Sequence, residues 1–292
     1  MAYFFASPAR RRLLAHALVV IGLVFAGYLF LVAAPLKGSL AVDAAAYWRV
    51  NLADPYRGEL GIDVGYFFAY SPPIAALFAL MGALPWLPFV VLWYGILLGA
   101  VVWLGRSSAL AVLAFPPVAI DLYHGNIHLL LAAAIVLGMR YPAAWSFVLL
   151  TKVTPGIGLL WFAARREWRS LAIALGATTL VVVVSAVFLP TQWLSWLEML
   201  RDNAGPLPPW PALPIPLWLR LPVAALIVLW GARRNARWSV PLAAALAIPA
   251  LWPGGFAILA ACWPLRSSQR VPTSTDSQYH ARDGRQPTVA AA

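Results

Sequence analysis

Charged residues are scarce in this chain. They make up 11% of its 292 residues, whereas hydrophobic residues make up 62% and the mean hydropathy is +0.79. A soluble domain carries roughly a quarter charged residues, so this composition excludes a soluble fold for most of the chain. In lipid the backbone must satisfy its own hydrogen bonds, and an α-helix does so within one segment. The composition therefore predicts an all-α polytopic membrane protein.

Cysteine is almost absent as well. The single residue, Cys262, lies in an apolar stretch, so an intrachain disulfide and a cysteine-based metal site are both excluded. The glycines at 61 and 65 follow no predicted strand, so they do not form a phosphate-binding loop. Thiol chemistry and nucleotide binding therefore find no support in the sequence.

Acids are rare relative to bases. The chain has 10 Asp and Glu against 21 Lys and Arg, which gives a net charge of +11. The arginines form short clusters between apolar runs, at 10–12, 165–169, 233–237 and 266–270. This placement follows the positive-inside rule for cytoplasmic loops, and contact with anionic lipid headgroups accounts for it. We expect membrane lipids as partners, both termini in the cytoplasm and no nucleic-acid binding.

Ten apolar runs are candidate membrane spans. They cover 13–34, 66–84, 86–104, 107–120, 126–139, 142–163, 170–190, 214–231, 238–252 and 254–265. A 14-residue helix reaches only about 21 Å of a hydrocarbon core that is roughly 30 Å thick. The pairs 107–120/126–139 and 238–252/254–265 are therefore predicted either as spans or as half-length hairpins. The expected bundle has about 8–10 transmembrane helices.

The composition changes abruptly after Arg266. Residues 267–292 are rich in Ser, Thr, Gln, Asp, Arg and Pro and hold almost no large apolar side chain. Such a segment buries too little apolar surface to fold. We predict one integral membrane domain over 1–266 and a disordered cytoplasmic tail over 267–292.

Four of the chain's ten acids lie in the segment 35–65, which follows the first span. They are Asp43, Asp54, Glu59 and Asp63. Within this segment, 41–52 has the spacing of an interfacial helix, with Tyr47 and Trp48 at headgroup depth outside the membrane. Polar chemistry is therefore expected at the water–lipid boundary.

Asp43 is the strongest candidate for that chemistry. A carboxylate near aromatic and apolar neighbours can have a raised pKa and serve as general base for a hydroxyl. The alternative interpretation is an ordinary solvated or helix-capping acid. Asp43 with Asp54 or Glu59 can also bind a divalent cation weakly, although the chemistry does not demand one.

A second long outside segment is predicted at 190–215. It contains Trp193, Trp196, Glu198 and Asp202, and it has prolines at 190, 206, 208, 209, 211 and 214. This proline density argues against a regular helix. It predicts a semi-rigid cover over whatever lies beneath.

Lys152 lies inside an apolar run that continues to Ala164. A lysine within a membrane span is costly and marks a functional site by default, whereas snorkelling towards an interface is the alternative. Pro155 breaks the helix locally and can hold Lys152 against a phosphate.

A polar knot at 121–128 separates two short apolar runs. It contains Asp121, His124, Asn126 and His128. The histidines at i and i+4 can be interpreted as zinc ligands, but a third ligand at fitting spacing is absent. Hydrogen bonding to a sugar or phosphate, and capping of helix ends, are the favoured interpretations.

Taken in order, these features resemble the polyprenol-phosphate-mannose-dependent glycosyltransferases of family 87, whose fold class is GT-C. The matching elements are Asp43 with Tyr47, Asp54-Pro55-Tyr56, the 68–78 stretch with Tyr70-Ser71-Pro72-Pro73, Leu84-Pro85, His124-Gly125-Asn126-Ile127-His128, and Lys152-Val153-Thr154-Pro155. Asn126 stands where the family has glutamine.

The resemblance implies an inverting transfer of a sugar, mannose first, from a polyprenyl-phosphate donor. The acceptor would be a glycolipid or lipoglycan at the outer face of the plasma membrane, and neither a cofactor nor a nucleotide sugar is required. Asp43 would be the catalytic base. Candidate donor-binding residues are Lys152, His124, Tyr47, Tyr70, Asn126 and His128.

Two functions of other classes stay open at this point. A transporter or flippase of a lipid-linked sugar would spread polar residues along a path through the bilayer, and the chain has no internal repeat to support it. A non-catalytic membrane scaffold would have no use for the acid-rich segment or for Lys152.

Overall fold

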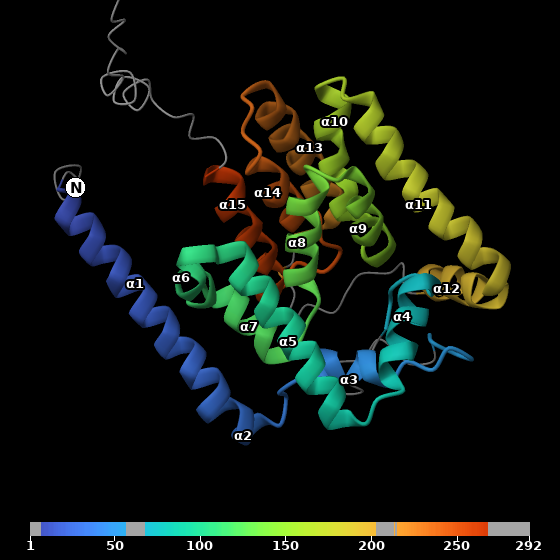
Figure 1. Cartoon of the computed structure of the whole chain (residues 1–292), viewed down its shortest axis with the longest axis horizontal. Coiled ribbons are helices and arrows are strands. Elements are labelled where there is room, and N and C mark those ends of the chain that lie inside the picture. Colours follow the sequence, from blue (N-terminus) through green and yellow to red (C-terminus); the bar gives the residue numbers. More distant parts are fainter. Residues whose placement is uncertain (1–6, 57–67, 203–212, 214, 268–292) are drawn as a thin grey trace, which may run out of the picture.

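The computed structural model describes residues 7–56, 68–202, 213 and 215–267. Every regular element in these ranges is a helix (Figure 1). The prediction of an all-α membrane protein is thereby confirmed. The predicted tail from 268 onwards lies outside the described residues, as do the acids Glu59 and Asp63.

Three of the described helices are long and apolar enough to cross a membrane. The first is a continuous helix formed by α1 (Pro8–Tyr28), a π-helical turn (Leu29–Ala33) and α2 (Ala34–Lys37). The second is α5 (Trp86–Gly105), which is extended through α6 (Ala109–Leu113). The third is α11 (Trp168–Phe188). Most of their apolar surface is not covered by other parts of the protein, so it needs lipid as its solvent. The spans predicted at 13–34, 86–104 and 170–190 are each present as one helix.

Prolines and glycines set several helix boundaries. α1, α4 (Pro72–Gly82) and α7 (Pro116–His124) have proline in the first turn, where its missing N–H is not needed. Gly38 and Gly125 follow α2 and α7 with φ of 61° and 68°. This left-handed conformation ends a helix and favours glycine, which has no Cβ to clash.

The polar knot lies at a sharp bend. α7 and α8 (His128–Gly138) are bent by 118° relative to each other. The runs predicted at 107–120 and 126–139, either as spans or as a half-length hairpin, correspond to this bent pair, whose first helix starts later than predicted, at Pro116. The bend at Gly125 brings the end of one helix against the start of the next.

The span predicted at 142–163 is not one helix. A 3₁₀ turn (Pro142–Ala144) leads into α9 (Trp145–Thr151), and a second 3₁₀ helix, η5 (Thr154–Leu159), leads into α10 (Leu160–Ala164). Between them Lys152 has extended backbone, with a φ of −144°. The break follows from Pro155, which cannot donate its N–H and disfavours helix before it.

The remaining predicted spans are also short. They form α4, α13 (Leu217–Arg233), α14 (Ser239–Leu246), a 3₁₀ helix, η6 (Pro253–Ala261), and α15 (Cys262–Ser267). By length and composition, three described helices can cross a membrane, or four if the bent pair counts as one span. The 8–10 crossings expected from the sequence are therefore not all formed by single long helices.

Two expectations for the outer segments are corrected. Helix α12 (Pro190–Asp202) occupies the first half of the predicted proline-rich cover, because Pro190 stands in the first turn and the other prolines follow residue 202. The predicted interfacial helix is present as α3 (Val42–Trp48), but Tyr47 is only 3% exposed. Tyr47 is thus a core residue of the protein and not an anchor at the headgroups.

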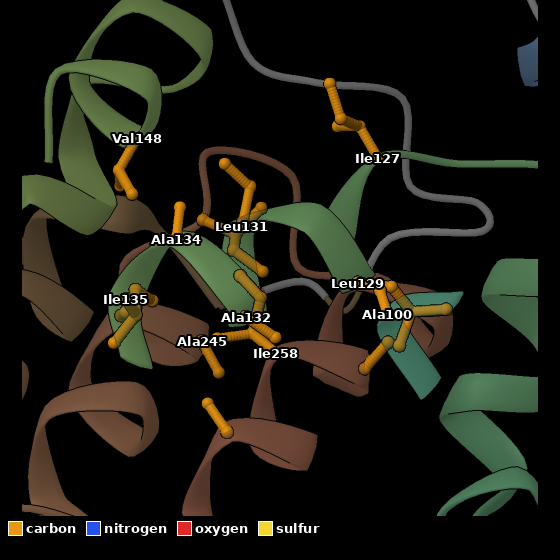
Figure 2. Packing of buried hydrophobic residues seen from close by; sticks show 14 of the residues in the cluster. Ala100, Ile127, Leu129, Leu131, Ala132, Ala134, Ile135, Val148, Ala245 and Ile258 are labelled. Carbon is orange, nitrogen blue, oxygen red and sulfur yellow. The ribbon is translucent and has the colours of Figure 1, made fainter. Parts of the chain in front are cut away.

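The core is centred on α8. Its Ala132 lies next to Ala245 of α14 and Ile258 of η6 in Figure 2. Alanines at 243–245 are fully buried, and such small side chains let neighbouring helices approach closely in a membrane protein. This packing fixes the bend between α7 and α8 against the C-terminal helices.

Candidate active site

Asp43 lies in the first turn of α3, and α3 is anchored to the bend between α7 and α8. The backbone N–H of Ala41 donates to the carbonyl of Tyr123 over 2.9 Å. Gly125 packs so closely that an added Cβ would lie 2.8 Å from the Cβ of Ala44. The segment after the first span is therefore joined directly to the polar knot.

Asn126 holds the Asp43 carboxylate. Its amide nitrogen donates to Oδ2 of Asp43 over 2.6 Å, and its Oδ1 accepts the backbone N–H of Ile127 at 2.7 Å. Because the second bond engages the oxygen, the nitrogen is the atom that points at Asp43. Asn126 thus orients the candidate base.

The surroundings of Asp43 suit a general base. Burial raises the pKa of the Asp43 carboxyl above its ordinary value, although the hydrogen bond from Asn126 and the nearby His124 and Lys152 act in the opposite direction. The side chain nevertheless stays partly exposed. A reachable carboxyl with a raised pKa can accept a proton from a hydroxyl.

A second set of polar groups connects Asp121, His128 and Lys152. Nδ1 of His128 donates to Oδ1 of Asp121 over 2.8 Å, and the backbone N–H of Leu129 donates to Oδ2 at 3.2 Å. On the other side of the ring, Nζ of Lys152 lies 2.7 Å from Nε2 of His128. Asp121 and His128 are fully buried, whereas Lys152 is partly exposed.

Tyr47 and Tyr70 form an aromatic wall of the site. Their hydroxyl groups share a hydrogen bond of 2.9 Å, and the ring of Tyr47 stacks on Phe78 with the centroids 4.5 Å apart. Nζ of Lys152 lies 5.9 Å from the centroid of the Tyr70 ring, within reach of a cation–π interaction. Both tyrosines are buried, so here they support α3 and Lys152, and a role in donor binding stays a prediction.

Trp252 also belongs to this site, although no motif singled it out. Its ring centroid lies 5.2 Å from that of His124 and 5.9 Å from that of His128. Trp252 is partly exposed and sits between α14 and η6. Its one signal in the sequence is the Pro253-Gly254-Gly255 turn that interrupts an apolar run.

The two histidines of the knot do not act as a metal pair in this arrangement. Nδ1 of His124 donates to the carbonyl of Ile120 over 3.0 Å, while both ring nitrogens of His128 face protein partners. Within the described ranges, no group of three or more His, Cys, Asp and Glu is placed to hold a metal ion. Both histidines therefore hydrogen-bond to protein groups, and a role of either towards a sugar or phosphate stays a prediction.

The site thus has two layers. The partly exposed side chains are Asp43, His124, Lys152 and Trp252. The buried side chains that hold them are Asn126, Asp121, His128, Tyr47 and Tyr70. A base and a cation held in place by buried hydrogen-bond partners can serve a reaction in which a hydroxyl loses a proton and an anionic group departs.

Comparison with known protein families decides between the functional classes. The sequence profile of glycosyltransferase family 87 matches residues 68–277, which is more than half of the chain. The chain belongs to glycosyltransferase family 87. No curated protein and no solved structure matches it. The matched part includes Lys152 and the knot, and Asp43 precedes it.

The Gly125 bend of this glycosyltransferase gives a first testable prediction. Gly125→Ala adds a Cβ that meets Ala44 and forces a left-handed backbone on alanine. We expect the free energy of unfolding to fall by about 1–3 kcal/mol, measured by thermal unfolding in detergent. Gly99→Ala in α5 is the matched control, since its Cβ would meet nothing within 4 Å. Equal melting temperatures for the two variants would contradict the prediction.

Proposed function

We propose that this glycosyltransferase moves a sugar, mannose first, from a polyprenyl phosphate to a glycolipid or lipoglycan hydroxyl at the outer face of the plasma membrane. The observation that carries the proposal is the pairing of a partly exposed base with a partly exposed cation. Asp43 is held by Asn126, and Lys152 is near enough to lower the pKa of Asp43.

The proposed reaction is an inverting displacement. The acceptor hydroxyl gives its proton to Asp43, its oxygen forms the new bond to the anomeric carbon, and the bond from that carbon to the phosphate oxygen breaks. The bonding electrons leave with the phosphate, so no general acid is needed, in contrast to an inverting glycosidase. The ammonium group of Lys152 stabilises the charge on the departing phosphate.

An apolar groove supports a lipid-linked donor. It lies open between α4 and α11 with a volume of about 390 Å³. Its lining includes Pro73, Ala76, Leu180, Val184 and Phe188. Pro73 of this lining lies two residues after Ser71, whose hydroxyl donates to the carbonyl of Leu150 over 2.6 Å, two residues before Lys152. Isoprene units in this groove would place the phosphate on the Lys152 side.

The arrangement of the long helices supports an outer-face site. α1 starts at the arginines 10–12 and leads towards Asp43, and α11 starts beside Arg169 and leads into α12. Gln192 of α12 donates to the carbonyl of Leu52, close in sequence to α3. Figure 1 shows the first ends of α1 and α11 on one side of the molecule and α3 on the other. With the arginines inside, Asp43 faces outside.

Reconstitution of the purified protein tests the donor. In liposomes containing an extract of envelope glycolipids, we expect transfer of labelled mannose from polyprenyl-phosphate mannose and none from a nucleotide-linked mannose. Polyprenyl-phosphate glucose is the matched control for the sugar. The anomeric configuration of the product should be opposite to that of the donor. Direct transfer from the nucleotide sugar, or retention of configuration, would overturn the proposal.

A further inference from the structure

Lys152 is held by partners that are themselves buried. Its Nζ lies 2.7 Å from Nε2 of His128, and His128 contacts Asp121 through the opposite ring nitrogen. Asp121 and His128 are both 0% exposed, so neither is reachable by a bulky substrate. What this buried pair can affect is the placement of the partly exposed lysine.

The hydrogen-bond pattern permits one tautomer of His128. A lysine ammonium group has donors only, so Nε2 of His128 must carry the lone pair that accepts from it. The proton of the neutral ring then lies on Nδ1 and is donated to Asp121. Oδ2 of Asp121 accepts the backbone N–H of Leu129, so both oxygens of this carboxylate have a donor.

We propose that Asp121 is a positioning residue, which fixes the Nδ1-protonated tautomer of His128 and thereby holds the Lys152 ammonium group at the donor phosphate. The statement about Lys152 and the phosphate rests on the function proposed above. The statement about the tautomer rests on the hydrogen-bond geometry together with Lys152 as an ammonium group. An aspartate that accepts the Nδ1–H of a histidine holds the imidazole in one tautomer and orientation, as in a Ser-His-Asp triad.

The Lys152 side chain needs a positioning contact because Lys152 lies where the helix is interrupted. The backbone of Lys152 is extended between α9 and η5, so no helical turn restrains its long side chain. Tyr70 faces the ammonium group at 5.9 Å, which adds attraction without a fixed direction. The bond to Nε2 of His128 is the directional contact.

Asp121→Asn should reverse the tautomer. The amide oxygen of the variant accepts the N–H of Leu129, because the amide nitrogen cannot, and the nitrogen then faces Nδ1 of His128 as a donor. The His128 proton moves to Nε2, where it opposes the ammonium group of Lys152. Lysine is displaced from the site while the volume of the buried side chain stays nearly unchanged.

Nitrogen-15 spectroscopy of histidine-labelled protein in detergent reads the tautomer directly. The chain has 4 histidines, and the signal lost in His128→Gln identifies His128. We expect protonated Nδ1 in the wild type and protonated Nε2 in Asp121→Asn. A wild-type signal with protonated Nε2 would overturn the proposal even if Asp121→Asn failed to fold.

Transfer kinetics with polyprenyl-phosphate mannose test the consequence for Lys152. We expect Asp121→Asn to lower kcat/KM for the donor by about 10–100-fold, and Lys152→Met to lower it at least as much. The double variant should equal Lys152→Met, because Asp121 acts through Lys152. Glu167→Gln, near the start of α11 and 38% exposed, should leave the rate and the effect of Asp121→Asn unchanged.

The spectroscopic and the kinetic experiment together distinguish failure of this inference from failure of the proposed function. If the wild type transfers from the lipid donor and the losses from Asp121→Asn and Lys152→Met add, Asp121 does not act through Lys152 and the inference is wrong. If the wild type does not use the lipid donor, the proposed function is wrong, and the histidine spectra still decide the role of Asp121 towards His128.

Discussion

Asp43→Asn should lower the rate of sugar transfer by about 10²–10⁴-fold, the usual contribution of a general base. Asparagine keeps the shape of the side chain, and its oxygen can still accept the amide hydrogen of Asn126, which lies 2.6 Å away in the wild type. The variant cannot accept the proton of the acceptor hydroxyl. The measurement is kcat/KM for transfer by the reconstituted protein at equal protein amounts.

The pH dependence of the wild type tests the same group. Burial raises the pKa of the Asp43 carboxyl, and the base works only when it is deprotonated. The rate should therefore fall as the pH drops through that raised pKa and level off above it. The residual rate of Asp43→Asn should not show this fall at low pH, because the variant has no carboxyl at position 43.

Glu167→Gln is the control for the change of an acid to an amide. Glu167 pairs with Arg165 over 2.8 Å near the start of α11, and it is 38% exposed. An exposed pair of this kind contributes little, so this variant should transfer sugar at the wild-type rate. Equal rates for Asp43→Asn and wild type would show that Asp43 is structural and that the base lies elsewhere.

The residues of the site could be predicted because polar side chains are rare in this chain. Asp43, Lys152 and the 121–128 knot interrupt apolar runs, and an ionisable residue in such surroundings has few structural uses. The structure brings all three together, with Asn126 bonded to Asp43 and His128 bonded to Lys152. The break at Pro155 was also predictable, because proline cannot continue a helix.

The partnerships within the site could not be predicted in the same way. Whether Asn126 faces Asp43 or a substrate depends on the left-handed Gly125, which sets the angle between α7 and α8. Trp252 joins the site from the segment between α14 and η6, and nothing in its local sequence relates it to His124. Such contacts depend on how distant helices pack, and hydrophobic pattern does not determine that packing.

Helix lengths were overestimated for a related reason. The apolar runs at 142–163 and 238–252 contain short helices and also irregular segments. Apolar composition indicates burial in lipid or protein and does not fix the length of a helix. Irregular backbone inside a membrane protein is tolerated where other groups satisfy its carbonyls. Arg220 is such a group.

Arg220 of α13 is 5% exposed, and its guanidinium group donates to the backbone. Nη1 donates to the carbonyls of Leu246 and Ile248, and Nη2 donates to the carbonyl of Pro249 over 2.8 Å. Nε donates to the carbonyl of Ile215 over 2.8 Å. These bonds hold the end of α14 and the irregular segment that leads to Trp252.

Arg220→Met should therefore destabilise the fold strongly. Methionine fills a similar volume but removes the donor of four carbonyls, and the carbonyl of the buried Ile248 is left without it. An orphaned buried group costs about 1–3 kcal/mol, so we expect a loss of this size in the free energy of unfolding, measured by denaturant unfolding in detergent micelles. The segment that carries Trp252 should loosen, which a shift of tryptophan fluorescence would report.

Arg233→Met is the matched control, because Arg233 is exposed in the last turn of the same helix. It removes the same charge and the same chemical group, so any general effect of losing an arginine from α13 appears in both variants. A surface substitution of this kind normally changes stability by less than about 0.5 kcal/mol. If Arg220→Met is as stable as Arg233→Met, water or rearranged backbone satisfies those carbonyls. Arg220 is then not what keeps the Trp252 segment against His124 and His128.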